Sequence, residues 1–230
     1  MDRLAQFFIS PLFLADSLDR ELHAVDSEHS KNRQSDIWRL DQLKRELSHH
    51  GHPFHKFGTG TFDTLKVQPE LNSMVPRDRM IDFFEEHYSA NLMKLAILGP
   101  EPLDVLESWV TDIFSQVPNK RLAPSLWQET DPFGPEQLGK LCFAKPIEDL
   151  IQLDLTFPMT DQWSLFESKP SHYISHLIGH EGPGSILSYL KAKGWADALT
   201  AGTEAVCAGS PSLYKCVVTL TEEVCKPVFP

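Results

Sequence analysis

Apolar residues recur every three or four positions through much of the chain, the spacing of amphipathic helices. This spacing predicts a short helix over 3–13 that ends near Pro11, and a long helix from a cap at Asp16 or Ser17 to about Ser48. Further helices are predicted over 76–89 and 101–117. Another is predicted over 170–192, interrupted at "GHEGPG" (179–184).

Short apolar runs between these helices predict strands over 92–99, 140–145, 150–157, 196–202 and 213–220. Residues 49–61 are predicted to form a loop, because glycine, proline and threonine interrupt every period there. Alternation of helices and strands on this scale indicates α+β or α/β layering. Residues 118–139 hold four prolines and no period, which predicts a connector between domains.

The composition excludes several classes of partner. The chain has 230 residues and a net charge of −11, whereas nucleic acids and anionic membranes reward a basic surface. No apolar run approaches the ~20 residues of a membrane-spanning helix. The four cysteines show no C-x-x-C spacing and are typical of reduced thiols in a cytosol-like compartment.

Glu21 and Glu28 lie seven residues apart in a segment of helical composition, so both side chains leave one helix face. Two readings are open. The spacing alone favours a solvated acidic face over half of a metal site, because two acids do not complete one.

His172, His176 and His180 lie at i, i+4 and i+8, beside Glu181. They resemble a zinc site, but the first and last lie about 12 Å apart along a helix, too far to share one tetrahedral ion easily. A surface helix is the favoured reading. The loop histidines at 49, 50, 52 and 55 are expected to be solvated. The sequence contains no H-E-x-x-H, H-x-x-E-H or serine-nucleophile motif, so the residues alone complete no active site.

Several segments nevertheless resemble the insulin-degrading enzyme (insulysin) and pitrilysin family of inverzincin zinc peptidases. The resemblance runs from residue 1 to about 200 and returns at "VTLTEE" (218–223). It is carried by "MDRLAQFFISPLF" (1–13), "DRELHAVDSEHSKN" (19–32), "HPFHKFGTGT" (52–61) and "HYISHLIGHEGPGSILSYLKAKGW" (172–195).

The resemblance implies that Glu28 is the third ligand of a catalytic Zn²⁺. It also implies that Glu21 helps to orient the ligands without contacting the metal. The family's H-x-x-E-H element, which holds two zinc ligands and the general base, is absent from these 230 residues and is expected upstream. We therefore expect this chain alone to be inactive and to bind zinc weakly, with no catalytic residue of its own.

The resemblance also implies an exosite that holds the N-terminal part of a peptide substrate. Its expected contacts are His172, His176, Gly179, Glu181, Leu199, Thr200 and Ala201. Ala201 stands where the family commonly has glycine, which could crowd the peptide. Trp38 is expected to line the pocket near the zinc.

The implied fold is α+β, an incomplete set of two-layer helix/antiparallel-sheet domains of the insulysin/mitochondrial-processing-peptidase type. Residues 1–125 would form the C-terminal part of the first, zinc-site domain. Residues 126–139 would be a proline-rich connector, and 140–230 would form the beginning of the second, homologous domain. The implied function is a fragment of a cytosolic zinc metalloendopeptidase that degrades peptides in a closed chamber, with peptides and the remaining domains as partners. The alternatives are a non-catalytic peptide- or partner-binding homologue and a truncated gene product without function.

Overall fold

The computed structural model describes residues 1–127, 130–207 and 209–225. The chain divides into two compact units. One contains Met1–His29 and Thr59–Ser125, and the other contains Ser30–Gly58 and Leu126–Pro230. The domain ranges of 1–125 and 140–230 stay a prediction, because the division of this chain into two compact units does not test them.

Among the described residues, every regular element of the first unit is a helix. Its elements are α1 (Asp2–Ile9), most of α2 (Ala15–Asn32), η2 (Asp63–Val67), α4 (Gln68–Leu71), α5 (Pro76–His87), η3 (Ala90–Leu92) and α6 (Leu103–Phe114). The helices predicted over 3–13, 76–89 and 101–117 are thereby confirmed. Ala5 of α1 and Leu106 of α6 are buried, and these two helices contact each other.

The long helix predicted from 16 to 48 is wrong as one element, because the chain breaks at 33–35 and begins again as α3 (Asp36–Glu46). Ser35 adopts an extended backbone at the N-cap of α3. The carboxylate of Asp36, only 3% exposed, accepts hydrogen bonds from the N–H groups of Ile147 and Glu148 at 2.9–3.1 Å. Ser35 followed by Asp36 is a recognisable helix-start signal. The single long helix was predicted because the apolar spacing continues past this pair.

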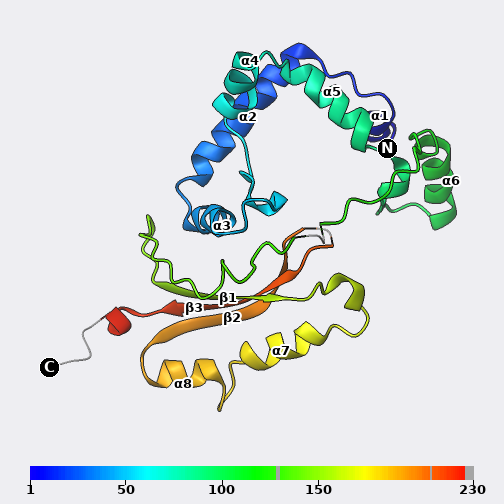
Figure 1. The fold of residues 1–230 in the computed structure, drawn as a ribbon. Coiled ribbons are helices and arrows are strands. Elements are labelled where there is room, and N and C mark those ends of the chain that lie inside the picture. The colour runs from blue at the N-terminus through cyan, green and yellow to red at the C-terminus, as the bar shows by residue number, and fades with distance from the viewer. Residues whose placement is uncertain (128–129, 208, 226–230) are drawn as a thin grey trace. The chain divides into compact units, whose positions relative to one another are not determined.

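The second unit is built on an antiparallel sheet in the order β1 (Gln152–Met159), β3 (Ser212–Leu220), β2 (Ala196–Ala205). Helices α7 (Pro170–Ile178) and α8 (Ile186–Ala192) lie along one face of it, as Figure 1 shows. The core between these layers contains Leu187, Ala196, Leu199, Cys216 and Val218. This two-layer α+β arrangement confirms the predicted fold class, and the break between α7 and α8 confirms the predicted interruption.

Two predicted strands are wrong. The stretches predicted over 92–99 and 140–145 have no strand partner among the described residues, and Leu92 ends the short helix η3 instead. A β-strand exists only where a neighbour completes its backbone hydrogen bonds. At the end of 140–145 and just beyond it, the backbone is bound by side chains of α3 instead. The carbonyl of Lys145 accepts from Arg39, and the carboxylate of Asp36 accepts from the N–H groups of Ile147 and Glu148. The strands predicted at 150–157, 196–202 and 213–220 are confirmed.

Candidate functional site

The strongest candidate site lies where α7 ends against β2. Gly179 caps α7 and donates its N–H to the carbonyl of Ser175 at 2.8 Å. A Cβ on Gly179 would lie 2.9 Å from that carbonyl and 3.8 Å from the backbone nitrogen of Ala201. The absent Cβ therefore avoids a clash with the carbonyl of Ser175 in the last turn of α7, while the main chain of β2 lies at ordinary contact distance.

β2 is an edge strand, because among the described residues it pairs only with β3. Its outer edge is therefore a row of backbone N–H and C=O groups without a strand partner in the described part of the chain. The side chain of Leu199 is buried in the core at 5% exposure, so Leu199 can offer a ligand only its backbone. Thr200 is exposed and Ala201 is half-buried.

Polar side chains lie along α7, from its first turn to the segment that follows it. His172, His176 and Glu181 are all exposed, and the rings of His176 and His180 lie 5.8 Å apart. No group of three or more His, Cys, Asp or Glu side chains in the described residues could hold a metal ion. The structure places His172, His176, Gly179 and Glu181 on or just after α7 and Leu199, Thr200 and Ala201 on the adjacent strand β2, and their role in an exosite stays a prediction.

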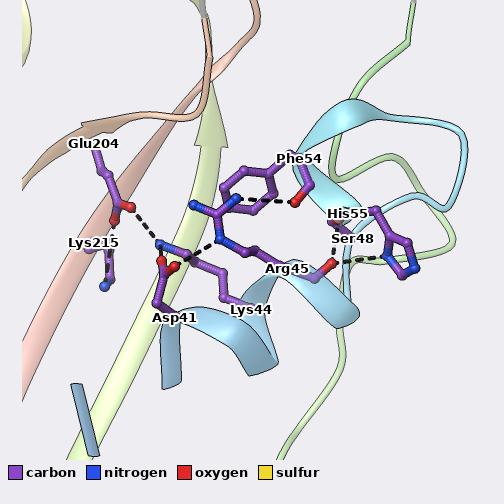
Figure 2. A network of polar contacts seen from close by, with 8 residues as sticks. All are labelled: Asp41, Lys44, Arg45, Ser48, Phe54, His55, Glu204 and Lys215. Carbon is purple, nitrogen blue, oxygen red and sulfur yellow. Dashed lines mark hydrogen bonds and ion pairs between the residues drawn. The ribbon is translucent and has the colours of Figure 1, made fainter. Parts of the chain in front are cut away.

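A charged network on the opposite face of the sheet holds β2 to α3 (Figure 2). Glu204 lies three residues beyond Ala201, so its side chain leaves the other face. Lys44 of α3 contacts Glu204 at 2.5 Å and Asp41 at 3.0 Å, and Lys215 of β3 approaches Glu204 at 3.6 Å. Burial alone would raise the pKa of Asp41, but hydrogen bonds from Arg45 and Lys44 outweigh it and leave the pKa below its ordinary value.

The same network orders the loop after α3. The guanidinium of Arg45 lies 4.6 Å from the ring centre of Phe54, and the carbonyl of Arg45 accepts from the hydroxyl of Ser48 at 2.6 Å (Figure 2). A ring nitrogen of His55 lies 3.1 Å from the same carbonyl. The loop over 49–58 is thus tied to α3 by side chains and is not a free connector.

His52 contradicts the expectation of a solvated loop histidine, because it is only 2% exposed. Its Nδ1 accepts the N–H of Phe54 at 3.1 Å, so Nε2 bears the proton in the neutral ring and faces Ser210 Oγ at 3.4 Å and Cys207 Sγ at 3.9 Å. Burial lowers the pKa of His52, and the nearby His49 adds to the effect. Burial also raises the pKa of the Cys207 thiol, which makes it a poor nucleophile. The signal that sequence reasoning missed is His52–Pro53–Phe54, a cap followed by a short helical turn.

The two candidate metal-site carboxylates lie on α2 in the first unit. Asp19 binds Lys66 at 2.6 Å and Asp26 accepts the N–H of Phe62 at 2.8 Å, so one face of α2 packs against 62–66. At about 100° per residue, Glu21 and Glu28 project from the opposite face, and both are exposed. Each carboxylate has no hydrogen-bond or ion-pair partner among the described residues.

Trp38 lies on α3 in the second unit and is 54% exposed. It is described with that unit alone, so its expected place near the zinc stays a prediction. None of the described helices combines the length and apolar character needed to cross a membrane.

Comparison with known proteins identifies the family. Residues 75–225 match the model described as Peptidase M16 inactive domain, and residues 1–51 match Insulinase (Peptidase family M16). The A-factor-processing enzyme of Saccharomyces cerevisiae is 46% identical over 91% of this chain and 20% of its own length. The human insulin-degrading enzyme is 44% identical over 97% of this chain and 22% of its own length.

A solved structure agrees with these relatives. The crystal structure of pitrilysin superposes with a TM-score of 0.83 at 29% identity, over 96% of this chain and 23% of that one. The chain therefore spans about one fifth of the length of the relatives it matches. The resemblance found in the sequence is confirmed, and the chain belongs to the M16 (insulinase, or insulysin/pitrilysin) family of metallopeptidases.

Proposed function

We propose that this chain contributes a peptide-binding exosite and one zinc ligand to an M16 metalloendopeptidase that degrades peptides within a closed, cytosolic chamber. The observation that supports this most directly is the outer edge of β2 beside Gly179. An extended peptide can add to such an edge as a further strand, with main-chain hydrogen bonds that do not depend on its sequence. This suits an enzyme that acts on varied peptides.

Glu181 would set the direction in which a peptide binds along this edge. Its exposed carboxylate lies in the segment between α7 and α8 and has no ion-pair partner among the described residues. A peptide's terminal ammonium group is the complementary charge, and a charge-assisted hydrogen bond would fix which end of the peptide lies at Gly179. His172 and His176 flank the same site from α7, and Thr200 and Ala201 supply the strand.

The zinc ion would be bound in part by Glu28. Its carboxylate is exposed, lies on a regular helix and has no competing partner among the described residues, as a ligand requires. Glu21, two turns earlier on the same face, would orient it. One carboxylate does not hold zinc by itself, so the other ligands belong to the rest of the enzyme. Bound zinc would polarise the peptide carbonyl and acidify the attacking water.

Peptide binding by the purified chain tests the exosite. A fluorescent eight-residue peptide with a free amino terminus should bind about 3- to 10-fold more tightly than its acetylated twin, because acetylation removes the charge that Glu181 would meet. Glu181→Gln should abolish that difference, whereas Glu136→Gln, a matched change at another exposed glutamate, should preserve it. Equal binding of both peptides to the unmodified chain would reject the exosite.

A non-catalytic homologue that captures peptides without cleaving them is the second candidate. It is favoured by one observation, that residues 75–225 match a domain described as inactive. Zinc content and turnover of the complete protein separate the two. A peptidase should hold one zinc per molecule and lose it on Glu28→Gln, whereas a binding homologue would bind peptides with no stoichiometric zinc.

A further inference from the structure

The loop that follows α3 is closed by hydrogen bonds that pass through one histidine. His52 is 2% exposed and precedes the short helical turn η1 (Pro53–His55). Its Nδ1 accepts the N–H of Phe54 at 3.1 Å, and its carbonyl accepts the N–H of His55 at 3.0 Å. The turn therefore depends on an unprotonated Nδ1, because a nitrogen that carries a proton cannot accept.

The same turn holds the loop against a distant segment of the second unit. The N–H of His49 donates to the carbonyl of Pro132 at 2.8 Å, and Pro132 is itself fully buried. Phe54 is 5% exposed, and its ring centre lies 6.2 Å from that of Phe133. Residues 49–58 are thus held through the turn, and loss of the turn would release Phe54 from its burial.

A proton added to His52 has no place in this arrangement. Nε2 already carries the proton of the neutral ring, and it faces the oxygen of Ser210 and the sulfur of Cys207. A second proton would bind Nδ1 and point at the N–H of Phe54, so that two donors would meet. The charged ring would also be buried, away from the water that solvates a cation. Protonation therefore favours a state in which the turn is open.

Most of the charged groups near His52 oppose its protonation. Burial lowers the pKa of His52, and the charge that His49 gains in acid lowers it further. The other cationic or titratable groups in contact with this loop add positive charge only. They are His50 and His55 of the loop itself and Lys44 and Arg45 of α3.

The remaining neighbours do not reverse this preference. Asp131 and the main chain at Trp127 favour the charged ring, but burial and His49 outweigh them, and the pKa of His52 stays below its ordinary value. From the connection between β2 and β3, the facing groups are Ser210 and Cys207. Burial raises the pKa of the Cys207 thiol, so this thiol is neutral near pH 7 and supplies no negative charge.

We propose that residues 49–58 form a pH-sensitive latch between α3 and the β2–β3 connection, closed while His52 is neutral and opened by its protonation. Each opening event takes up one proton and breaks the hydrogen bond from Phe54 to Nδ1. The open latch uncovers Phe54 and the hydroxyl of Ser210. This device belongs to the second unit alone and depends neither on the proposed exosite nor on zinc.

Proton uptake determines how steeply the latch responds to pH. When only the open loop accepts the proton, each pH unit below the ordinary histidine pKa of 6.5 raises the opening constant by up to about tenfold. The opening constant should therefore rise about tenfold between pH 7.5 and pH 5.5.

Amide hydrogen exchange, followed by NMR on the 230-residue chain, measures this opening. Protection is the intrinsic exchange rate at each pH divided by the observed rate. Protection at Phe54, His55 and Lys56, whose N–H groups are hydrogen-bonded within the turn, should fall about tenfold from pH 7.5 to pH 5.5. The amides of β3 should stay better protected than these three at both pH values, because they open only with the sheet.

A low concentration of urea separates local opening from unfolding of the whole unit. Opening of the latch exposes little surface, so exchange in the turn should not respond to 0.5 M urea, whereas exchange in β3 should accelerate. Equal protection and equal urea response in the turn and in β3 would overturn the latch, since the loop would then open only when the unit unfolds.

Two variants identify the proton. His52→Asn keeps an acceptor for the N–H of Phe54 but does not titrate, so protection in the turn should be equal at the two pH values. His50→Asn removes an exposed histidine of the same loop and should leave the tenfold change intact. A change that survives His52→Asn, or that disappears in His50→Asn, would overturn the latch.

The ring of His52 in the unmodified chain gives a test that needs no variant. Its nitrogen chemical shifts show which nitrogen carries the proton. We expect Nδ1 to be unprotonated at pH 7.5 and to gain its proton only together with the loss of protection at Phe54. A neutral ring protonated at Nδ1, or a charged ring in a loop that keeps its protection, would overturn the proposal even if His52→Asn does not fold.

Discussion

Replacement of Leu187 by alanine should destabilise the second unit by about 3 kcal/mol. Leu187 of α8 is 1% exposed and packs against Ala196, Leu199, Cys216 and Val218. The change removes three carbon atoms, worth ~2.4 kcal/mol of transfer free energy at ~0.8 per methylene, and leaves a cavity that adds to the loss. The better helix propensity of alanine recovers only a few tenths.

Urea unfolding followed by tryptophan fluorescence measures this loss. The signal reports mainly on the second unit, which contains Trp38, Trp127, Trp163 and Trp195. The matched control is Ile186→Ala, the preceding residue of the same helix, which is 49% exposed and should cost less than 1 kcal/mol. The midpoint should fall at an unchanged slope for Leu187→Ala.

A loss below 1 kcal/mol for Leu187→Ala, or equal losses for the two variants, would refute the assigned core. It would mean that α8 does not pack on the sheet through this face. Because Leu199 belongs to the same core, a correct assignment also predicts that peptide binding at β2 weakens in proportion to the unfolded fraction and no further.

Three further predictions concern charge. A double-mutant cycle with Lys44→Met and Glu204→Gln should give a coupling free energy of ~0.5–1 kcal/mol, because the two side chains are 13% and 38% exposed. This coupling should shrink in 1 M salt, which screens the charges. A coupling of zero would contradict the contact in Figure 2. Burial lowers the pKa of His52, so the unfolded chain binds a proton first and stability should fall as pH drops below about 6.5. His52→Asn, which keeps an acceptor for the N–H of Phe54, should lose that part of the pH dependence in urea unfolding, and equal slopes would refute the buried neutral ring. In the complete enzyme, Glu28→Gln should lower zinc content and kcat/KM about 100-fold or more, whereas retained zinc by elemental analysis would remove Glu28 from the ligand set.

The local sequence was sufficient to predict those helices and strands whose buried face follows from their own apolar spacing. The helices near Pro76 and over 101–117 follow from apolar spacing and a first-turn proline, and β2 and β3 follow from β-rich runs between turn residues. The interruption after α7 follows from the glycines at 179, 182 and 184. The family also followed from the sequence, because its motifs are specific.

The tertiary structure decided what depends on distant partners. Residues 92–99 and 140–145 have strand composition, but strand formation needs a neighbouring strand to complete its hydrogen bonds. The break before α3 depends on Asp36, whose carboxylate binds backbone N–H groups more than a hundred residues away. His52 reads as a solvated loop histidine until the β2–β3 connection covers it.

The candidate site shows the same division. Residue types and spacing marked the histidines of α7 and the acids of α2 as polar helix faces, and the resemblance assigned them roles. Only the fold placed Gly179 beside Ala201 of the edge strand β2. A one-dimensional period specifies which face of an element is apolar, but not which residues of another element will meet it. Contacts between residues distant in sequence form only when the chain packs, because packing supplies the free energy that orders them.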